Sequence, residues 1–507
     1  MEPSVKRKPW KNWLLFIATM VIVFLLGLLA SSITQRKAES EYVYKPKVRL
    51  DEYEPRNALW GENFPREYQS YMRTADTDFA SRYNGNVYID MLARDPRMVV
   101  LWAGYAFSKD YSQGRGHYYA ITDIRNTLRT GSPKKPEDGP QPNTCWTCKS
   151  PDVPRLMEKL GPKDFYKGKW ASRGNEIVNH IGCADCHDPG TMDLRITRPA
   201  LIEAFKAMGR DISKATHQEM RSLVCAQCHV EYYFDKHRQD APDVAYLTFP
   251  WKYGTSADSA LKYYNETGFS DFTHQISKAP MLKAQHPDYE IYLTGIHADR
   301  GVACADCHMP YIKEGGQKFT SHKITSPLSN ISNTCQVCHR ESEEALRENV
   351  YERQDKVKQI RDIAETELVR AHVEAGAAWE AGAGDKEMDA GLKHIRNAQW
   401  YWDYTAASHG ASFHSPIEVS RIIGLSISEA KEARLEFARI LMKHGKNSEI
   451  PYPDIATKEK AQKFIGLQMD QLNKEKQEFL KNLVPLWDRQ ANEREKQWYK
   501  PENDKKD

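Results

Sequence analysis

The stretch Asn143–Pro151, NTCWTCKSP, holds two cysteines separated by two residues and followed by a lysine. Four later segments repeat this spacing but end in histidine: CADCH at 183–187, CAQCH at 225–229, CADCH at 304–308 and CQVCH at 335–339. The 507-residue chain has ten cysteines, and all of them fall in these five pairs. The repeated pair therefore indicates a repeated cofactor or cross-link, and Lys149 marks one copy as chemically different.

CxxC pairs occur in zinc sites, in redox disulfides and in c-type haem attachment sites. Zinc takes four ligands, usually from two such pairs, and needs no histidine directly after the second cysteine. Redox pairs usually occur singly, near a βαβ pattern that is not evident in this sequence. In CxxCH, two thioether bonds attach the porphyrin to one turn of backbone, and the histidine becomes an axial ligand of the iron. Four copies in one chain favour covalent haem over a zinc or disulfide role.

This interpretation gives every motif its residues. The attachment cysteines are Cys145 and Cys148, Cys183 and Cys186, Cys225 and Cys228, Cys304 and Cys307, and Cys335 and Cys338, and the proximal ligands are His187, His229, His308 and His339. We expect Lys149 to ligate a fifth haem as the neutral amine, which requires loss of a proton from a group with a pKa of about 10.4. A degenerate site with a surface lysine is the simpler alternative. Haem with two histidine ligands suits electron transfer, whereas haem with one unusual ligand and an open face can reduce a substrate.

The N-terminal segment predicts export. Basic residues at positions 6, 7, 8 and 11 precede an uncharged run over 13–34, which is close to the roughly 20 residues that span a bilayer. The positive-inside rule leaves residues 1–12 in the cytosol and the body outside it. We expect a transmembrane anchor, and a cleaved signal segment with the small residues Ala30–Ser32 at its cleavage site is the alternative. The 72 basic and 69 acidic side chains nearly cancel, which gives no support for a nucleic-acid partner.

The rest of the chain divides by composition. Residues 35–59 are polar and aperiodic, as in a linker. Residues 60–340 are rich in Gly, Pro and aromatic residues, which predicts short helices and loops around a core that flat, apolar haems would supply. Residues 341–507 show apolar residues at helical spacing, with helices expected over 341–381, 386–409, 416–445 and 457–496. The predicted fold class is mainly α: a multihaem cytochrome c with a loop-rich, haem-packed body and long C-terminal helices.

One CxxCK followed by four CxxCH, with KAQH at 283–286 between the third and fourth motifs, resembles the ammonia-forming pentahaem cytochrome c nitrite reductases of the cytochrome c-552 family. The resemblance covers about Tyr105 to Pro416. It implies five covalent haems c, bound Ca²⁺, and an oxidoreductase that reduces nitrite to ammonium with six electrons. The lysine-ligated haem would carry out the reduction, and four haems with two histidine ligands would feed it.

The resemblance also implies residue roles. Arg129, Tyr232 and His286 would meet the substrate near Lys149, with Arg125 as a competitor for the role of Arg129. Calcium would take side-chain oxygens of Glu231 and Gln285 and backbone carbonyls of Tyr232 and Lys283, the hard oxygen set that Ca²⁺ prefers. The distal ligands of the second, third, fourth and fifth haems would be His322, His117, His414 and His297. His409 is the rival for the role of His414, and His180 is expected to be structural.

The family further implies a periplasmic homodimer that contacts its partner through C-terminal helices. Its electron donor would be a membrane quinol-oxidising multihaem cytochrome, with a soluble pentahaem donor as the other option. Two other functions stay open at this point. The chain could be a pure electron carrier without small-molecule catalysis, or a reductase whose main substrate is hydroxylamine or sulfite.

Overall fold

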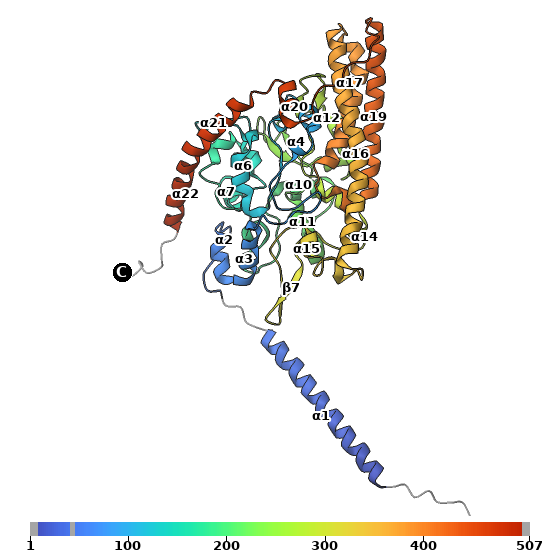
Figure 1. The fold of residues 1–507 in the computed structure, drawn as a ribbon. Helices are drawn as coiled ribbons and strands as arrows, with labels where there is room; N and C mark the ends of the chain where they lie inside the picture. Colours follow the sequence, from blue (N-terminus) through green and yellow to red (C-terminus); the bar gives the residue numbers. More distant parts are fainter. Residues whose placement is uncertain (1–8, 41–45, 499–507) are drawn as a thin grey trace, which may run out of the picture. The chain divides into compact units, whose positions relative to one another are not determined.

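A computed structural model describes residues 9–40 and 46–498 of the chain (Figure 1). The chain divides into two units, Met1–Arg49 and Leu50–Asp507. Three stretches lie outside the described residues: 1–8 of the predicted cytosolic segment, 41–45 of the predicted linker and 499–507 at the end of the predicted long-helix region.

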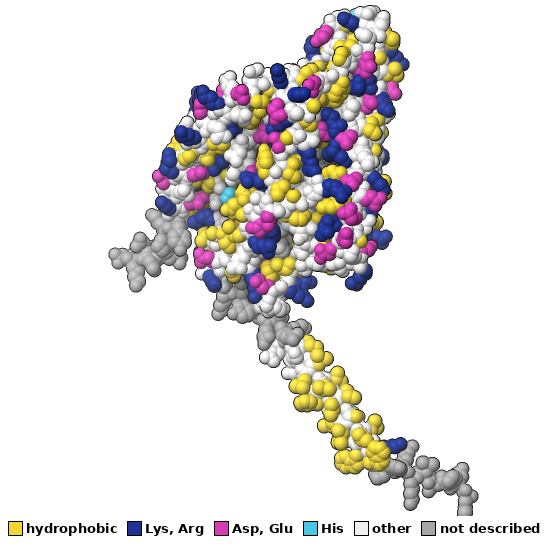
Figure 2. Space-filling view, viewed as in Figure 1, with side chains coloured by type: hydrophobic (Ala, Val, Ile, Leu, Met, Phe, Trp, Pro, Cys, Tyr) yellow, Lys and Arg dark blue, Asp and Glu magenta, His cyan; other side chains and the backbone are white. Residues whose placement is uncertain are grey.

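The described part of the first unit is mainly one helix, α1 (Pro9–Ser40). Its stretch Trp10–Gln35 has a mean hydropathy of 2.7 and is long and apolar enough to cross a membrane, as either an anchor or a signal segment. The hydroxyls of Thr19 and Thr34 each donate to a carbonyl four residues earlier at 2.8 Å. The helix therefore satisfies these polar groups internally, which an apolar surrounding requires. In Figure 2 its surface is almost wholly apolar.

The second unit begins with a body of short elements, as the composition predicted. Its helices are α2 (Asn57–Asn63), α3 (Pro65–Met72), α4 (Met91–Arg94), α5 (Arg97–Leu101), α6 (Ala120–Asn126), α7 (Asp152–Leu160), α8 (Pro162–Tyr166), α9 (Cys183–Cys186), α10 (Pro199–Ala207), α11 (His217–Ala226), α12 (Ala257–Thr267), α13 (Asp288–Leu293), α14 (Ile296–Asp299) and α15 (Cys304–His308). Short 3₁₀ turns connect many of them, including η4 (Leu128–Thr130), η5 (Asn143–Trp146) and η10 (Cys335–Val337).

The described strands form four small antiparallel pairs. They are β1 (Ile89–Asp90) with β2 (Ser112–Gln113), β3 (Tyr233–Asp235) with β4 (Tyr246–Thr248), β5 (Phe272–Thr273) with β6 (Pro280–Met281), and β7 (Tyr311–Glu314) with β8 (Gln317–Thr320). None of these pairs makes a layer of its own, so the mainly α fold class is confirmed.

Three of the four predicted C-terminal helices are present with nearly the expected bounds. They are α16 (Glu343–Glu380), α17 (Asp385–Ala406) and α19 (Pro416–Lys443), which pack side by side, and a single turn, α18 (Ala411–His414), precedes α19 (Figure 1). The Ser342 side chain caps α16 by accepting from the Ala345 amide at 3.2 Å. Pro416 begins α19, where its missing N–H costs nothing.

The fourth predicted helix, 457–496, is wrong as a single element. The chain there forms α20 (Lys458–Phe464), α21 (Met469–Asn482) and α22 (Val484–Trp498). Gly466 has φ of +76°, a left-handed conformation that ends α20. Pro485 lies in the first turn of α22 and has no N–H with which to continue α21. Amphipathic spacing continued through both breaks and masked them.

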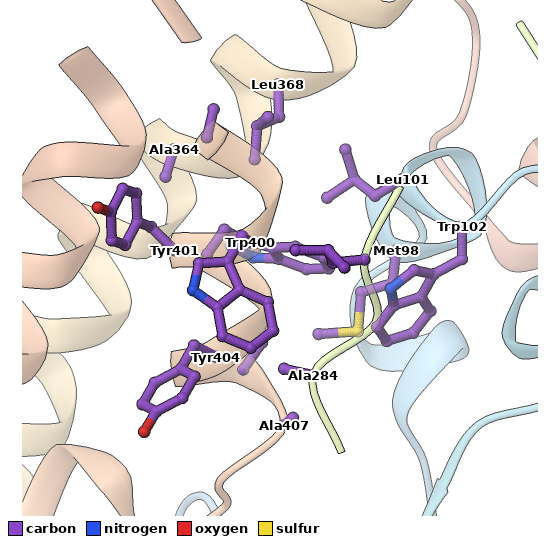
Figure 3. Packing of buried hydrophobic residues seen from close by; sticks show 14 of the residues in the cluster. Met98, Leu101, Trp102, Ala284, Ala364, Leu368, Trp400, Tyr401, Tyr404 and Ala407 are labelled. Carbon is purple, nitrogen blue, oxygen red and sulfur yellow. The ribbon is translucent and has the colours of Figure 1, made fainter. Parts of the chain in front are cut away.

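The largest core lies where the helices α16, α17 and α19 meet the body. Figure 3 shows Met98 and Trp102 of the body close to Trp400 of α17, and Ala284 beside them. The indole rings of Trp102 and Trp402 lie 5.5 Å apart, and both side chains are fully buried. Because Ala284 belongs to this core, the KAQH segment is anchored in it.

Candidate functional site

Each CxxC motif forms one turn of helix. In three of the four histidine motifs, the amide of the histidine, at 187, 229 and 339, donates at 2.9 Å to the carbonyl of the first cysteine. The fourth, Cys304–His308, is the helix α15 itself. In the lysine motif the turn is tighter, because the Lys149 amide donates to the Trp146 carbonyl at 2.9 Å. The motifs therefore present two thiols and the following side chain from one short, rigid turn.

The ten cysteines, all within the described residues, are free, so no disulfide is formed there. Thiols of different motifs lie close together. A hydrogen bond from Cys225 lowers the pKa of Cys304 to about 7, and a hydrogen bond from Cys228 lowers the pKa of Cys148. The third motif therefore adjoins both the first and the fourth. Groups held by these motifs would be near enough to one another to pass electrons.

Histidine pairs lie across from each other at a regular spacing. The ring centres of His187 and His322 are 6.1 Å apart, those of His308 and His414 are 6.3 Å apart, and those of His297 and His339 are 6.4 Å apart. A metal ion bonded to two imidazoles, at about 2 Å from each nitrogen, separates their ring centres by about 6 Å. These pairs are the ones expected for the second, fourth and fifth motifs, and they leave room for an iron between the rings.

Hydrogen bonds fix the orientation of several of these rings. The Nδ1–H of His187 donates to the Met192 carbonyl at 2.9 Å, and that of His308 donates to the Thr325 carbonyl at 3.0 Å. On the opposite side, the Nδ1–H of His322 donates to the Thr320 carbonyl at 2.9 Å. Because a carbonyl only accepts, Nδ1 carries the proton and Nε2 is left free to bind a metal.

The third motif differs from the others. Burial, together with nearby His229 and Lys149, lowers the pKa of His117 to about 4, so His117 is neutral and lies near His229. The ring of His229 also lies 6.5 Å from that of His286. Its Nδ1 is 3.2 Å from a carboxylate oxygen of Asp288 rather than from a carbonyl.

The two other histidines weighed from sequence have different surroundings. The Nε2 of His409 is 3.3 Å from the hydroxyl of Tyr111, so this ring is already engaged, whereas the ring of His414 lies across from His308. His180 stacks on Tyr118 with ring centres 4.7 Å apart. The geometry thus favours His414 over His409 as a ligand.

Tyr232 and His286 lie near the lysine motif. Burial lowers the pKa of His286 well below its ordinary value, and the next cause is the nearby Lys149 ammonium. Burial raises the pKa of Tyr232 well above its ordinary value, and nearby Cys148 and Cys145 add to the effect. Lys149 is half-buried, and within the described residues its ammonium makes no hydrogen bond or ion pair. The lysine is therefore available to act as a ligand, close to a neutral histidine and a protonated tyrosine.

Arg129 and its competitor Arg125 are distinguished by their partners. The guanidinium of Arg129 lies 4.5 Å above the ring centre of Phe107, and its Nε donates to the Thr127 hydroxyl at 3.2 Å. No carboxylate of the described chain pairs with it. The Arg125 guanidinium is buried, 2.8 Å from an oxygen of Asp488, and donates to the Gly174 carbonyl. Arg129 is thus free to meet an anion, whereas the charge of Arg125 is compensated.

The residues named for calcium lie together. One carboxylate oxygen of buried Glu231 accepts from the Tyr264 hydroxyl at 2.9 Å, and the other accepts from the Gln285 amide at 2.6 Å. The Gln285 side chain reaches the Lys283 carbonyl at 3.0 Å. Burial raises the pKa of Glu231 well above its ordinary value. A buried carboxylate without a basic partner, beside an amide oxygen and backbone carbonyls, fits a hard cation such as Ca²⁺.

A buried ion pair also holds the segment that contains Lys283 and Ala284. The ammonium of Lys283 lies 2.8 Å from an oxygen of Asp403 on α17, and the Ala284 amide donates to the other oxygen at 3.2 Å. The segment that carries the Lys283 carbonyl is thereby fixed to α17.

Sequence reasoning missed Asp288 and Lys476. Asp288 follows directly on the KAQHP stretch, so a search for carboxylates close to the motif would have found it. Lys476, on α21, contacts residues on both sides of Arg129. Lys476 and Arg129 lie 347 positions apart in the sequence. The local sequence of Lys476 resembles any exposed amphipathic helix, so no signal marks it.

Comparison with known proteins agrees with this arrangement. The family model described as cytochrome c552 matches residues 56–499. The cytochrome c-552 of Porphyromonas gingivalis is 57% identical over 488 residues, covering 96% of this chain and 97% of that one. The cytochrome c-552 of Maridesulfovibrio salexigens is 46% identical and covers 97% of this chain and 98% of its own.

One solved structure is similar over most of the chain. It is the catalytic subunit, NrfA, of the cytochrome c nitrite reductase of Desulfovibrio desulfuricans, described with two calcium sites. It matches with a TM-score of 0.72 and 32% identity, covering 80% of this chain and 90% of that one. With the motif order, the histidine pairs and these matches in agreement, the chain belongs to the cytochrome c-552 family.

Proposed function

We propose that this chain reduces nitrite to ammonium at a c-type haem ligated by Lys149, and that four haems with two histidine ligands supply the electrons. The contrast between two kinds of site carries the proposal. Three histidine pairs have the spacing of six-coordinate iron, whereas Lys149 has an unengaged amine with Tyr232 and His286 nearby. The similarity to a cytochrome c nitrite reductase supports the same reaction.

Nitrogen passes from +3 in nitrite to −3 in ammonium, so the reaction takes up six electrons and eight protons. A haem bound at this motif would supply an iron that can bind the substrate and transfer single electrons. Arg129 binds the anion through its guanidinium, which has no competing carboxylate among the described residues. Such a fixed charge stabilises negative charge on the substrate oxygens as the N–O bonds weaken.

Tyr232 and His286 serve as hydrogen-bond donors and proton carriers. The raised pKa of Tyr232 keeps its hydroxyl protonated at neutral pH, so it can donate. The lowered pKa of His286 keeps its ring neutral, with one N–H to donate and one nitrogen to accept a proton from solvent. Neither side chain is charged at neutral pH, so neither competes with Arg129 in attracting the anionic substrate.

Ca²⁺ is proposed to bind Glu231, Gln285 and the carbonyls of Tyr232 and Lys283. Glu231 directly precedes Tyr232, Gln285 directly precedes His286, and Lys283 lies three residues before His286. A cation there would fix both stretches of backbone and add positive charge near the bound anion.

The setting of the enzyme is also a proposal. The apolar helix α1 suits an anchor that holds the body on the periplasmic side of the inner membrane, with a cleaved signal as the alternative. A membrane quinol-oxidising multihaem cytochrome would then be the electron donor. The long helices α16 and α19 carry exposed apolar residues, including Ile363, Leu435 and Met442, which suits a homodimer contact.

The function is tested by ammonium production from nitrite with a reduced dye as electron donor. Replacement Lys149→His should convert the site toward two-histidine chemistry and slow turnover about 10²-fold, the scale on which a misplaced reacting group costs rate. The matched control is Lys159→His, ten residues later on the exposed side of α7. A Lys149→His variant with the wild-type rate and unchanged haem spectra would contradict the role of Lys149.

The alternative functions give different outcomes in the same assay. A pure electron carrier would show no high-spin haem signal that responds to nitrite or cyanide. A reductase devoted to hydroxylamine or sulfite would show a higher kcat/KM for that substrate than for nitrite.

A further inference from the structure

Lys476 is a buried cation on α21 whose donors all point at one loop. Its side chain is 3% exposed. The ammonium donates to the Arg125 carbonyl and to the Thr130 hydroxyl, each at 3.2 Å, and also to the Gly131 carbonyl. These acceptors lie on both sides of Arg129 in the sequence. The three N–H groups of Lys476 are therefore used to hold the loop that presents this arginine.

Residues at the start of α22 also contact the loop that presents Arg129. Asp488 pairs with the Arg125 guanidinium at 2.8 Å. Beside it, Trp487 packs so closely on Gly174 that a Cβ there would come within 2.4 Å of the indole ring. Only glycine leaves room for this contact, and the Gly174 carbonyl also accepts from Arg125.

The two helices also reach the lysine motif. Phe479 of α21 and Trp487 of α22 pack against Trp170, with ring centres 6.1 Å and 5.6 Å away. Trp170 in turn stacks on Trp146 at 4.7 Å and accepts its indole N–H through the backbone carbonyl at 2.9 Å. Trp146 lies between Cys145 and Cys148. The packing of the two helices against Trp170 therefore constrains the turn that carries Lys149.

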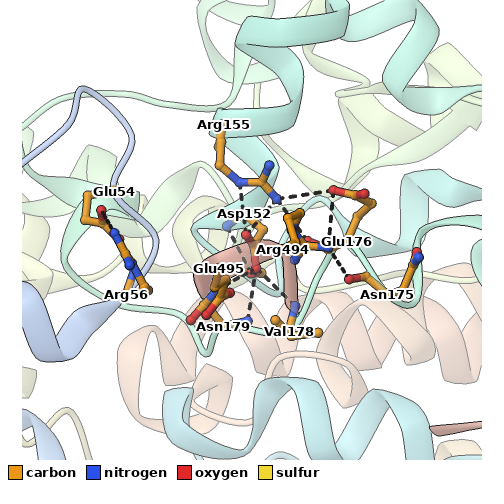
Figure 4. A network of polar contacts seen from close by, with 11 residues as sticks. Glu54, Arg56, Asp152, Arg155, Asn175, Glu176, Val178, Asn179, Arg494 and Glu495 are labelled. Carbon is orange, nitrogen blue, oxygen red and sulfur yellow. Dashed lines mark hydrogen bonds and ion pairs between the residues drawn. The ribbon is translucent and has the colours of Figure 1, made fainter. Parts of the chain in front are cut away.

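A polar network continues this contact, as Figure 4 shows. Asp152, three residues after Lys149, is fully buried and accepts from the amides of Val178 and Asn179 at 3.0 Å. The Asn179 side chain donates to Glu495 of α22 at 2.9 Å, and Arg494 donates to the Asn175 carbonyl. The segment behind Lys149 is thus tied to α22 by hydrogen bonds as well as by aromatic packing.

We infer that α21 and α22 act as a clamp that positions Arg129, and through Trp146 and Asp152 also Lys149, with Lys476 as its principal positioning residue. The inference rests on the proposed function, because it takes Arg129 as the group that binds nitrite. Packing alone would be met by a leucine or methionine at position 476, without the cost of burying an ammonium. The use of all three donors on the 125–131 loop is what separates a positioning role from simple packing.

The test compares Lys476→Met with Lys474→Met in the full-length holoenzyme. Lys474 is exposed on the same helix and makes no hydrogen bond or ion pair within the described residues, so its variant controls for loss of a lysine. Methionine preserves most of the volume and removes the donors. For Lys476→Met we expect kcat/KM for nitrite to fall about tenfold, mainly through a raised KM, because a displaced arginine binds the anion less well.

Hydroxylamine provides a readout that general damage would not give. It is uncharged at neutral pH, so it depends less on Arg129, and its kcat/KM should fall at most about twofold in Lys476→Met. Haem content, the ligand-free haem spectrum and the activity of Lys474→Met should match the wild type. Equal losses for nitrite and hydroxylamine, or a nitrite KM equal to that of Lys474→Met, would overturn the clamp.

A second variant keeps the test decisive if Lys476→Met does not fold. Asp488 has an approximately half-exposed side chain, so Asp488→Asn should fold and should still release Arg125 from its partner. A nitrite-selective rise in KM is expected here too, and its absence would count against the clamp. The proposed function fails separately: wild-type enzyme that makes no ammonium from nitrite refutes it, whatever the Lys476 variants do.

Discussion

Asp288 places a carboxylate oxygen 3.2 Å from the Nδ1 of His229, while its other oxygen accepts from the Ser408 hydroxyl at 2.5 Å. The other proximal histidines differ. Those at 187 and 308 donate to backbone carbonyls, and the Nδ1 of His339 is 3.9 Å from the nearest carboxylate. A carboxylate makes a histidine a stronger electron donor to its metal and favours the oxidised iron.

Replacing Asp288 by Asn should therefore raise the reduction potential of one haem, that of the third motif. This motif adjoins the lysine motif, so turnover should also fall about tenfold, the lower end of what the loss of such a partner costs. A redox titration followed by the haem spectrum measures the potentials. The exposed Asp299→Asn on α14 is the control, and five unchanged potentials in Asp288→Asn would contradict the prediction.

Calcium removal should lower activity without loss of haem. Glu231→Gln takes away the charged oxygen of the proposed site, so we expect one Ca²⁺ fewer per chain and a fall in kcat of about tenfold to 10²-fold. Metal analysis and the haem spectrum, measured on the same sample, separate the two effects.

Chelation of the wild-type enzyme provides the matched experiment. Activity should return with Ca²⁺ but not with Mg²⁺, since Mg²⁺ requires shorter bonds and near-octahedral geometry. Recovery with Mg²⁺ alone, or full activity of Glu231→Gln, would show that the cation site is not where we place it.

The sequence predicted what depends on short-range pattern and missed what depends on distant partners. The CxxC turns and the helices α16, α17 and α19 follow from residues within a few positions of each other, so periodicity and spacing sufficed. The choice between Arg125 and Arg129 could not be made that way, because the partner that neutralises Arg125 is Asp488 on α22. The proposed role of Lys476 depends in the same way on the loop 125–131, which is distant in the sequence. The sequence of an amphipathic helix does not distinguish an exposed lysine from a buried one.

Removing one partner of the buried pair formed by Lys283 and Asp403 should be strongly destabilising. Both side chains are at most 1% exposed, and their charged atoms lie 2.8 Å apart. Asp403→Asn leaves the ammonium buried without its counter-ion, which costs about 3–5 kcal/mol in the free energy of unfolding. Denaturant unfolding of the holoenzyme measures the loss. Asp389→Asn removes the partner of an exposed lysine at the same distance, and should change stability by less than about 1 kcal/mol.

Acid should destabilise the chain through His274 and His372, whose rings stack with centres 3.7 Å apart in a fully buried position. His274 donates to the Val100 carbonyl and accepts from two backbone amides. His372 donates to Gln399 and accepts from the Ser277 hydroxyl. A proton on His274 would break its bonds with the two backbone amides, and a proton on either ring would place a buried charge beside the other ring.

Burial accordingly lowers the pKa of His372 to about 4 and that of His274 well below its ordinary value. The unfolded chain binds protons near pH 6.5, so the stabilisation is complete above that pH and is lost as the pH falls toward 4, by about 1.4 kcal/mol per pH unit for each histidine. His372→Gln should reduce the slope of unfolding free energy against pH across this range, since one titrating ring and its repulsion of the other are gone. His217→Gln, at an exposed position that begins α11, should leave the slope unchanged. An identical slope for His372→Gln and the wild type would mean that the stacked pair does not titrate on unfolding, and that acid lability arises elsewhere in the chain.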